Sequence, residues 1–325
     1  MGPLDAIINE KPICVLINPN ANEGRALEFY REKIKPPLDK HNRVYHEKIT
    51  ESPEYAVDFV RSDKEHLVYI IVSGDTGSNA AAEGAVRSEL EKYLVFPGGG
   101  IGCDIPKTFP FNINHNSGEL CHQLSNASIK REDMWEVNGL YFLAYAGLGY
   151  DSIVLDEWKK KRILRGKPAY FAAAFRALSK YKPREMTIKF NGEDGAVEKD
   201  LSAFLIVASN VESYAGGAIN FSAEPDDGLL DFHVISDGTS AFMNFLSTRL
   251  GGQIDKQVVY SHRVRELEVF CREPVPLQVN GEKVPLQESG ERVEVHTAIG
   301  KPHYRYRYRF AHTGKRANVL VQNTG

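Results

Sequence analysis

Short apolar runs and helical patterns alternate along the first third of the chain. Residues 13–17 and 67–72 are unbroken apolar runs, which are typical of strands buried on both faces of a parallel sheet. Two further strands are predicted over residues 44–49 and 93–96. Amphipathic segments between these runs predict helices over residues 25–38, 54–61 and 79–90. This alternation predicts an α/β domain whose parallel sheet is covered on both faces.

The pattern changes at about Trp135, after which strand patterns dominate. Helical patterns interrupt them near residues 168–181 and 240–250. Gly, Asn and Asp punctuate the runs, as in a mostly antiparallel β-sandwich or barrel. The boundary predicts one domain over residues 1–135 and a β-rich domain over 136–299. The predicted strands are 140–146, 186–190, 203–209, 230–235, 267–271, 276–279 and 293–296.

Composition narrows the functional classes. The chain has 325 residues, which is enough for about two domains. Its net charge of -3 argues against a protein that coats nucleic acid. The four cysteines form no C-x-x-C pair and the histidines show no ligand spacing, so no zinc site is predicted. No apolar run approaches the roughly 18–20 residues of a membrane span, and no signal peptide is predicted, so we expect a cytoplasmic protein that meets membranes at most from their surface.

Turns rich in small residues follow three strands of the first domain. In a parallel sheet such turns meet at one edge, where ligands bind and where glycine lets the backbone approach a phosphate. The alternative is that the glycines serve only the geometry of tight turns. The candidate phosphate-binding residues are Asn18, Pro19, Asn20, Gly24, Arg25, Ser73, Gly74, Thr76, Gly77, Gly98, Gly99 and Gly100.

The ordered series of motifs resembles the diacylglycerol kinase catalytic domain family, which includes bacterial lipid kinases and sphingosine kinases. Beyond the three turns, the series comprises residues 146–151 (AGLGYD), 225–231 (PDDGLLD) and 279–282 (VNGE). The resemblance implies a fold like that of NAD kinase and diacylglycerol kinase, with a strand in 300–325 returning to the first domain. It also implies ATP and Mg2+ as cofactors, a lipid hydroxyl as acceptor, and Asp226 and Asp227 at a magnesium-linked site.

Several positions depart from the family pattern. The Gly-Thr order is reversed at Thr76 and Gly77, Ala80 replaces a glutamate, and Ser222 replaces an aspartate. Asn280 stands where the family has an aspartate that serves as general base, and an amide cannot accept that proton. Either Asp75 or Glu282 takes the proton, or the chain no longer performs the reaction. Asp75, which ends a buried strand, is also the better candidate for a nucleotide or metal contact, since we expect no structural role for a carboxylate there.

Two hypotheses therefore stand beside a lipid kinase: a catalytically impaired nucleotide-binding relative, and a kinase of a soluble hydroxylated metabolite. From Lys159 to Arg184 the chain has ten basic and no acidic residues. This segment is either an anionic-membrane contact or the solvated side of a packed helix. Residues 303–310 (HYRYRYRF) predict a strand with Arg305, Arg307 and Arg309 on one face, most simply solvated. The acceptor and the oligomeric state stay open, a homodimer included.

Overall fold

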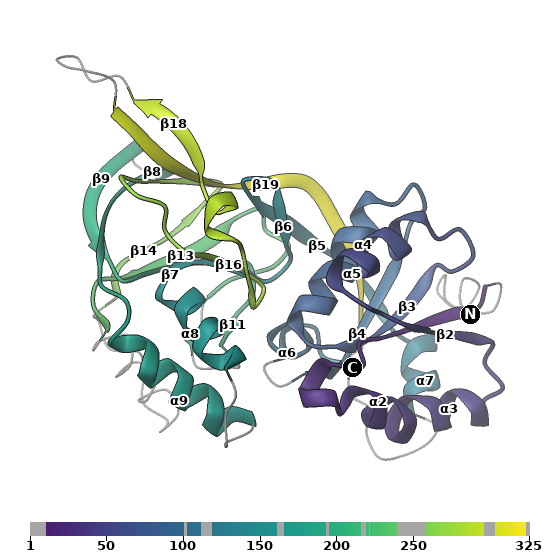
Figure 1. The fold of residues 1–325 in the computed structure, drawn as a ribbon. Helices are drawn as coiled ribbons and strands as arrows, with labels where there is room; N and C mark the ends of the chain where they lie inside the picture. The colour runs from purple at the N-terminus through teal and green to yellow at the C-terminus, as the bar shows by residue number, and fades with distance from the viewer. Residues whose placement is uncertain are drawn as a thin grey trace. The chain divides into compact units, whose positions relative to one another are not determined.

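A computed structural model describes residues 11–100, 103–111, 119–160, 166–192, 195–215, 219–220, 222–238, 258–295 and 303–322. The chain divides into two compact units. The first unit comprises Met1–Met134 with Gly314–Gly325, and the second comprises Trp135–Thr313. Strand β19 (His303–Val321) contributes to both units, and each unit is described separately below (Figure 1).

The first unit is built on parallel strands in the order β2-β1-β3-β4. The end of β19 (His303–Val321) adds a further parallel partner, because Asn318 and Val319 pair with Tyr93 and Leu94 of β4. The strands are β1 (Ile13–Ile17), β2 (Tyr45–Ile49), β3 (Val68–Ser73) and β4 (Tyr93–Gly99), and the helices are η1 (Ala21–Gly24), α2 (Ala26–Phe29), η2 (Tyr30–Ile34), α3 (Lys35–Lys40), α4 (Pro53–Ser62), α5 (Asp75–Arg87), α6 (Asp104–Thr108) and α7 (Glu119–Ser125).

Helices cover both faces of this sheet (Figure 1). On one face, Val15 and Ile70 pack with Tyr30, Ile34 and residues of α7 in one buried cluster. The other face is covered by α4 and α5. These helices pack closely at Gly84, where a Cβ would lie only 2.7 Å from the carbonyl oxygen of Val57. Alternating side chains of one strand are thus buried on opposite faces, which explains the unbroken apolar runs.

The second unit is antiparallel. One sheet has the order β14-β13-β10-β7-β16-β17, and in the other β19, β15, β8 and β9 are neighbours. Helices α8 (Tyr150–Lys159) and α9 (Gly166–Leu178) follow β7. The remaining elements are β5 (Ser128–Val137), β6 (Leu140–Phe142), β7 (Tyr145–Gly149), β8 (Arg184–Gly192), β9 (Gly195–Ala203), β10 (Leu205–Ser209), β11 (Ser213–Tyr214), β12 (Ile219–Asn220), β13 (Leu230–Ile235), β14 (Val258–Val264), β15 (Glu266–Cys271), β16 (Leu277–Val279), β17 (Glu282–Lys283), η3 (Leu286–Glu288), β18 (Glu291–Val295) and β19 (His303–Val321).

The two antiparallel sheets share one core. Leu148 and Phe232 from the first sheet are buried in the same cluster as Ile188, Val269 and residues of β19 from the second. Alternating inward side chains of both sheets therefore form a sandwich. The predicted fold class, an α/β unit followed by an antiparallel β-sandwich, is confirmed. Among the described residues, no helix is long and apolar enough to cross a membrane.

Two predicted elements are divided in the structure. The helix predicted over residues 25–38 is interrupted by a π-helical turn, η2, immediately before α3. Pro36 and Pro37 at the start of α3 cannot donate backbone hydrogen bonds, which explains the wider turn. The strand predicted over 140–146 ends at Phe142 and restarts at Tyr145. The helix predicted over 240–250 lies outside the described residues.

Candidate functional site

Three loops of the first unit meet at one edge of its sheet. Strands β1, β3 and β4 are parallel, so the loops that follow Ile17, Ser73 and Gly99 all leave from their carboxyl ends. The backbone N–H of Asn18 donates to the carbonyl of Val72 at 3.0 Å, which joins the first loop to β3. The sequence-predicted phosphate-binding residues of all three loops therefore lie along this edge.

The loop after β1 is ordered by its own polar groups. The side-chain oxygen of Asn18 accepts a hydrogen bond from the N–H of Asn20 at 3.0 Å, across Pro19. Asn22, Glu23 and Gly24 then take left-handed φ values of 53°, 57° and 89°. The guanidinium of Arg25 folds back onto Asn22, with Nη2 3.3 Å from the side-chain oxygen.

Glycines allow the other two loops to touch. A Cβ on Gly100 would lie 2.4 Å from the Cα of Gly74, and a Cβ on Gly77 would lie 2.1 Å from the Oγ of Ser73. Close packing therefore requires glycine at 77 and 100, as the alternative interpretation held. Gly98 differs, because its φ is +101° and no atom lies within 4 Å of a Cβ built there. Gly98 is buried within β4, where it pairs with Val72 of β3, so glycine there serves a strand position with positive φ.

Two buried hydroxyls lie next to these loops. Ser73 is 2% exposed and Ser78 is fully buried, and neither Oγ has a hydrogen-bond partner within the described part of the chain. Such orphaned groups are rare in folded proteins. Ser73 also lines a small hollow of about 10 Å³ together with Leu16, Asn18, Thr50, Ser52, Pro53, Ala56, Ile71 and Gly77. Hydroxyl donors beside glycine backbone fit a phosphate, and sequence analysis missed Ser78.

Asp75 begins α5 and connects two loops. Its Oδ1 accepts a hydrogen bond from the N–H of Ile105 at 2.9 Å, which caps α6. Burial, followed by the charge of neighbouring Asp104, raises the pKa of Asp75 to about 6. The expectation that Asp75 has no structural role was therefore wrong. Thr76 is the second residue of the same helix and is partly exposed.

In the second unit, Asn280 holds the backbone between β6 and β7. It is 1% exposed, has a left-handed φ of 45°, and its Oδ1 accepts hydrogen bonds from Ala144 N at 3.2 Å and Tyr145 N at 3.1 Å. Asn210 binds the same segment, since its Nδ2 donates to the carbonyl of Leu143 at 3.0 Å. These side-chain bonds explain the break in the strand predicted over 140–146.

A buried carboxylate that the sequence analysis did not select lies beside this segment. Asp151 Oδ2 accepts hydrogen bonds from the Tyr214 hydroxyl and from Gln278 Nε2, both at 2.9 Å. Burial raises the pKa of Asp151 to about 6 although these donors oppose the shift. A Cβ on Gly147 would lie 1.7 Å from Asp151 Oδ2, which explains the glycine in the 146–151 motif.

The other predicted acidic residues of this unit differ in their surroundings. Glu282 is exposed and its Oε1 lies 2.8 Å from Lys159 Nζ. Asp226 is exposed, whereas Asp227 accepts a hydrogen bond from Leu229 N at 2.8 Å and pairs with Arg263. Within the described residues, no group of three ligand side chains includes Asp226 or Asp227. Their magnesium role stays a prediction.

The basic segments are largely paired where they are described. Lys180 Nζ lies 2.6 Å from Glu157, and Arg184 lies 2.9 Å from Glu273. The buried face of α9 consists of alanines, while Phe175 is 64% exposed. On β19, Arg307 pairs with Glu291 at 2.6 Å, and Arg309 pairs with Glu266. These pairs fit a solvated basic face on β19.

Comparison with known proteins identifies relatives. Residues 144–296 match the family model described as the YegS C-terminal NAD kinase beta sandwich-like domain. A diacylglycerol kinase of Bacillus subtilis (strain 168) is 22% identical over 274 residues, which cover 81% of this chain and 88% of that protein. A Staphylococcus carnosus (strain TM300) protein named "Putative lipid kinase" is 30% identical over 154 residues, or 46% of this chain, and the chain spans only 47% of that relative.

The fold also matches a solved structure. A crystal structure of a diacylglycerol kinase from Bacillus anthracis str. Sterne superimposes with a TM-score of 0.66 at 18% identity, covering 97% of this chain and 98% of that chain. These matches confirm the predicted resemblance: residues 144–296 are similar to the YegS C-terminal NAD kinase beta sandwich-like domain, and the chain is similar to proteins named diacylglycerol and lipid kinases.

Proposed function

We propose that this chain is an ATP-dependent lipid kinase, which transfers the γ-phosphoryl group of ATP to a lipid hydroxyl. One observation carries the proposal. The loops after β1, β3 and β4 gather at a single edge of the parallel sheet, and the Ser73 hydroxyl beside them has no hydrogen-bond partner among the described residues. Backbone N–H groups and hydroxyls at such an edge suit the phosphates of a nucleotide. The names of the relatives support the reaction class.

Phosphoryl transfer depends chiefly on positioning and on offsetting negative charge. The three loops would position the nucleotide in this proposal. Bound magnesium would supply charge compensation, and because Mg2+ keeps several waters it needs only one or two protein carboxylates. Asp226 is exposed whereas Asp227 is half-buried, so Asp226 offers the more accessible carboxylate for that part.

We assign the role of general base, which takes up the proton of the acceptor hydroxyl, to Asp75. A general base works best when its pKa lies near the working pH, and the pKa of Asp75 is raised to about 6. The amide of Asn280 accepts hydrogen bonds but cannot take up a proton at neutral pH. Glu282 is exposed and bound to Lys159, so it is the weaker candidate.

The lipid acceptor is supported by the surface of α9. Phe175 is 64% exposed, and Lys182 is exposed shortly after the helix. An exposed aromatic ring beside basic residues suits the headgroup region of an anionic membrane, where each basic residue contributes about 1 kcal/mol. A soluble hydroxylated acceptor would not need this surface.

A second candidate function is a catalytically impaired relative that binds nucleotide. The observation that favours it is Asn280, whose side-chain oxygen is held by two backbone N–H groups. In that case, ATP binds but no ADP is released, and Asn280→Asp raises turnover.

The test is ADP release from MgATP by the full chain, with diacylglycerol, ceramide and sphingoid bases presented in mixed micelles. We expect turnover with at least one lipid above the rate with micelles alone. Nucleotide binding without turnover on any lipid would support the impaired relative. Turnover only with soluble alcohols would overturn the lipid assignment.

A further inference from the structure

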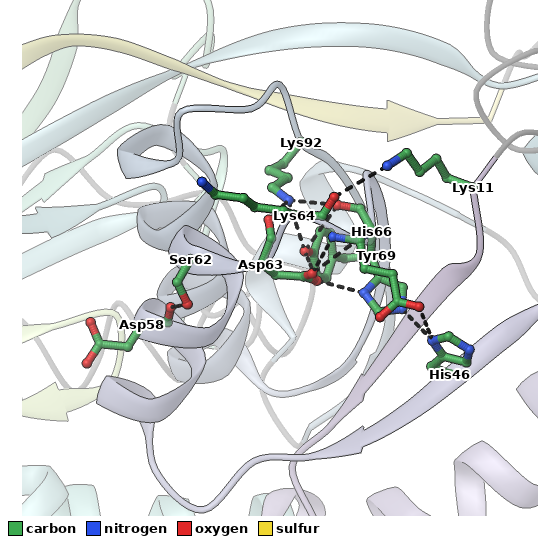
Figure 2. Close-up of polar contacts among 10 residues, drawn as sticks. Lys11, His46, Asp58, Ser62, Asp63, Lys64, His66, Tyr69 and Lys92 are labelled. Atoms are coloured by element: carbon green, nitrogen blue, oxygen red, sulfur yellow. Dashed lines mark hydrogen bonds and ion pairs between the residues drawn. The ribbon is translucent and has the colours of Figure 1, made fainter.

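A cluster of polar side chains lies at the amino ends of the first unit's parallel strands, opposite the edge with the glycine loops. Figure 2 shows the contacts of His46, His66 and Asp63 in this cluster. His46 is the second residue of β2, and Glu65 and His66 lie just before β3, so all three belong to the amino ends of parallel strands. Their ligand atoms lie within 4.8 Å of one another, and no other such group of three occurs among the described residues. His46 Nδ1 is 2.8 Å from His66 Nε2 and 3.5 Å from Glu65 Oε1.

The orientation of His66 is fixed by groups behind it. Its Nδ1 lies 2.7 Å from Asp63 Oδ2, and the hydroxyl of Tyr69 donates to the same carboxylate oxygen at 2.5 Å. Because Asp63 accepts from Nδ1–H, the lone pair of His66 Nε2 points toward His46. A carboxylate that orients a histidine in this way is the usual outer-shell partner of a metal ligand.

A buried lysine makes this arrangement rigid. Lys92 is 2% exposed, and its Nζ donates to the carbonyls of Asp63 at 2.5 Å and of His66 at 2.7 Å. Asp63 Oδ1 in turn accepts from the N–H of Glu65 at 2.8 Å. The segment that carries Glu65 and His66 is therefore held in place before any ligand binds.

We propose that His46, Glu65 and His66 bind a zinc ion. Two imidazole nitrogens and one carboxylate oxygen form a donor set that suits Zn2+, with water completing a tetrahedron. Tetrahedral ligands at about 2.0–2.1 Å from zinc lie about 3.3 Å apart. The two imidazoles therefore need to separate by only a few tenths of an ångström, which exposed His46 permits while buried His66 stays in place.

A zinc ion here would stabilise the fold and take no part in phosphoryl transfer, because the site lies at the edge opposite the proposed nucleotide loops. β2 is an edge strand that pairs only with β1 among the described strands. A metal shared by His46 on β2 and His66 before β3 ties this edge strand to the connection between α4 and β3. Local motifs do not reveal the site, since the two histidines are 20 positions apart.

The test is calorimetric titration of Zn2+ into the metal-stripped full chain, with variants His46→Gln and Glu65→Gln. Both altered residues are substantially exposed, so the variants should fold. The matched control is His41→Gln, an exposed histidine outside the cluster. We expect one zinc per wild-type chain, at least about tenfold weaker binding for His46→Gln, a smaller loss for Glu65→Gln, and no change for His41→Gln.

Thermal unfolding gives a second readout. A zinc concentration about a hundredfold above Kd should raise the unfolding midpoint of the wild type by about 5 °C, and magnesium at the same concentration should not. The proposal is overturned if the wild type binds no zinc, or if His46→Gln binds it as tightly as the wild type. Neither result depends on kinase activity.

Discussion

The carboxylate of Asp75 accepts a hydrogen bond from the backbone N–H of Ile105 at 2.9 Å. One side chain therefore joins the start of α5 to the helix that follows β4. The same carboxylate has a pKa raised to about 6 by burial and by Asp104. Asp75 thus combines a structural contact with a raised pKa, which suits the general-base role proposed for it.

Substitutions at Asp75 separate these two roles. Asn at this position keeps an oxygen that can accept from Ile105, but it cannot take up a proton. We expect Asp75→Asn to fold normally and to lose about 10²–10⁴-fold in kcat. Asp75→Ala should lose as much activity and also about 1–3 kcal/mol of stability, because the N–H of Ile105 loses its acceptor. Steady-state kinetics and urea unfolding measure both effects. Wild-type kcat in Asp75→Asn would leave Asp75 with the structural role alone.

The contact between Gly74 and Gly100 gives a second prediction. A Cβ at Gly100 would lie 2.4 Å from the Cα of Gly74, so Gly100→Ala should displace one loop and cost about 1–3 kcal/mol. We expect ATP affinity to fall at least tenfold, as measured by calorimetry.

The control for this prediction is Gly139→Ala in the second unit. Gly139 has a φ of +84° with no atom near a built Cβ, so the substitution strains a turn without a clash. The cost is about 1–2 kcal/mol, similar to that for Gly100→Ala, but ATP affinity should not change. If Gly100→Ala and Gly139→Ala bound ATP equally well, the contact between Gly74 and Gly100 would have no role in nucleotide binding.

The sequence predicted the parallel sheet and the common edge of the three loops, because apolar runs and glycine turns are local signals. It could not show that Gly77 and Gly100 are required by contacts, nor that Asp75 caps α6, since Ile105 is 30 positions away. The buried position of Asp151 was not predicted for the same reason, because its partners Tyr214 and Gln278 come from strands distant in sequence. Contacts distant in sequence leave no periodic pattern.

Asn280 should behave as a structural residue. Its Oδ1 accepts from Ala144 N and Tyr145 N in a buried position. We expect Asn280→Ala to lose about 2–4 kcal/mol, since two buried donors lose their acceptor. Asn280→Asp keeps an acceptor oxygen and should lose less stability at pH 5 than Asn280→Ala. Denaturant unfolding measures both, and equal losses at that pH would contradict this assignment.

Asp151 should make the stability of the chain depend on pH. Its pKa is raised from 3.8 to about 6 in the folded protein, so the folded state binds the proton more tightly than the unfolded state. This contribution is full below about pH 4 and is lost as the pH rises through about 6, a change of about 3 kcal/mol. Comparing Asp151→Asn with the wild type from pH 4 to 7.5 isolates it. A constant difference in unfolding free energy would refute the raised pKa.

The surface of α9 predicts membrane binding. Phe175→Ser combined with Lys182→Glu should reduce co-sedimentation with vesicles containing anionic lipid by about tenfold. The matched control is Leu286→Ser on η3, an apolar residue that is 43% exposed, and it should bind like the wild type. Binding that is unchanged in the double variant, or equal on neutral vesicles, would remove the membrane role.

The central proposal is that the loops after β1, β3 and β4 bind the phosphates of a nucleotide. Calorimetric titration of ATP into the full chain in excess magnesium tests it most directly. We predict saturable binding at one site per chain, and at least tenfold weaker binding in Gly100→Ala. A wild-type titration that shows no heat with ATP or GTP at any temperature tested would contradict the nucleotide site and the kinase assignment that depends on it.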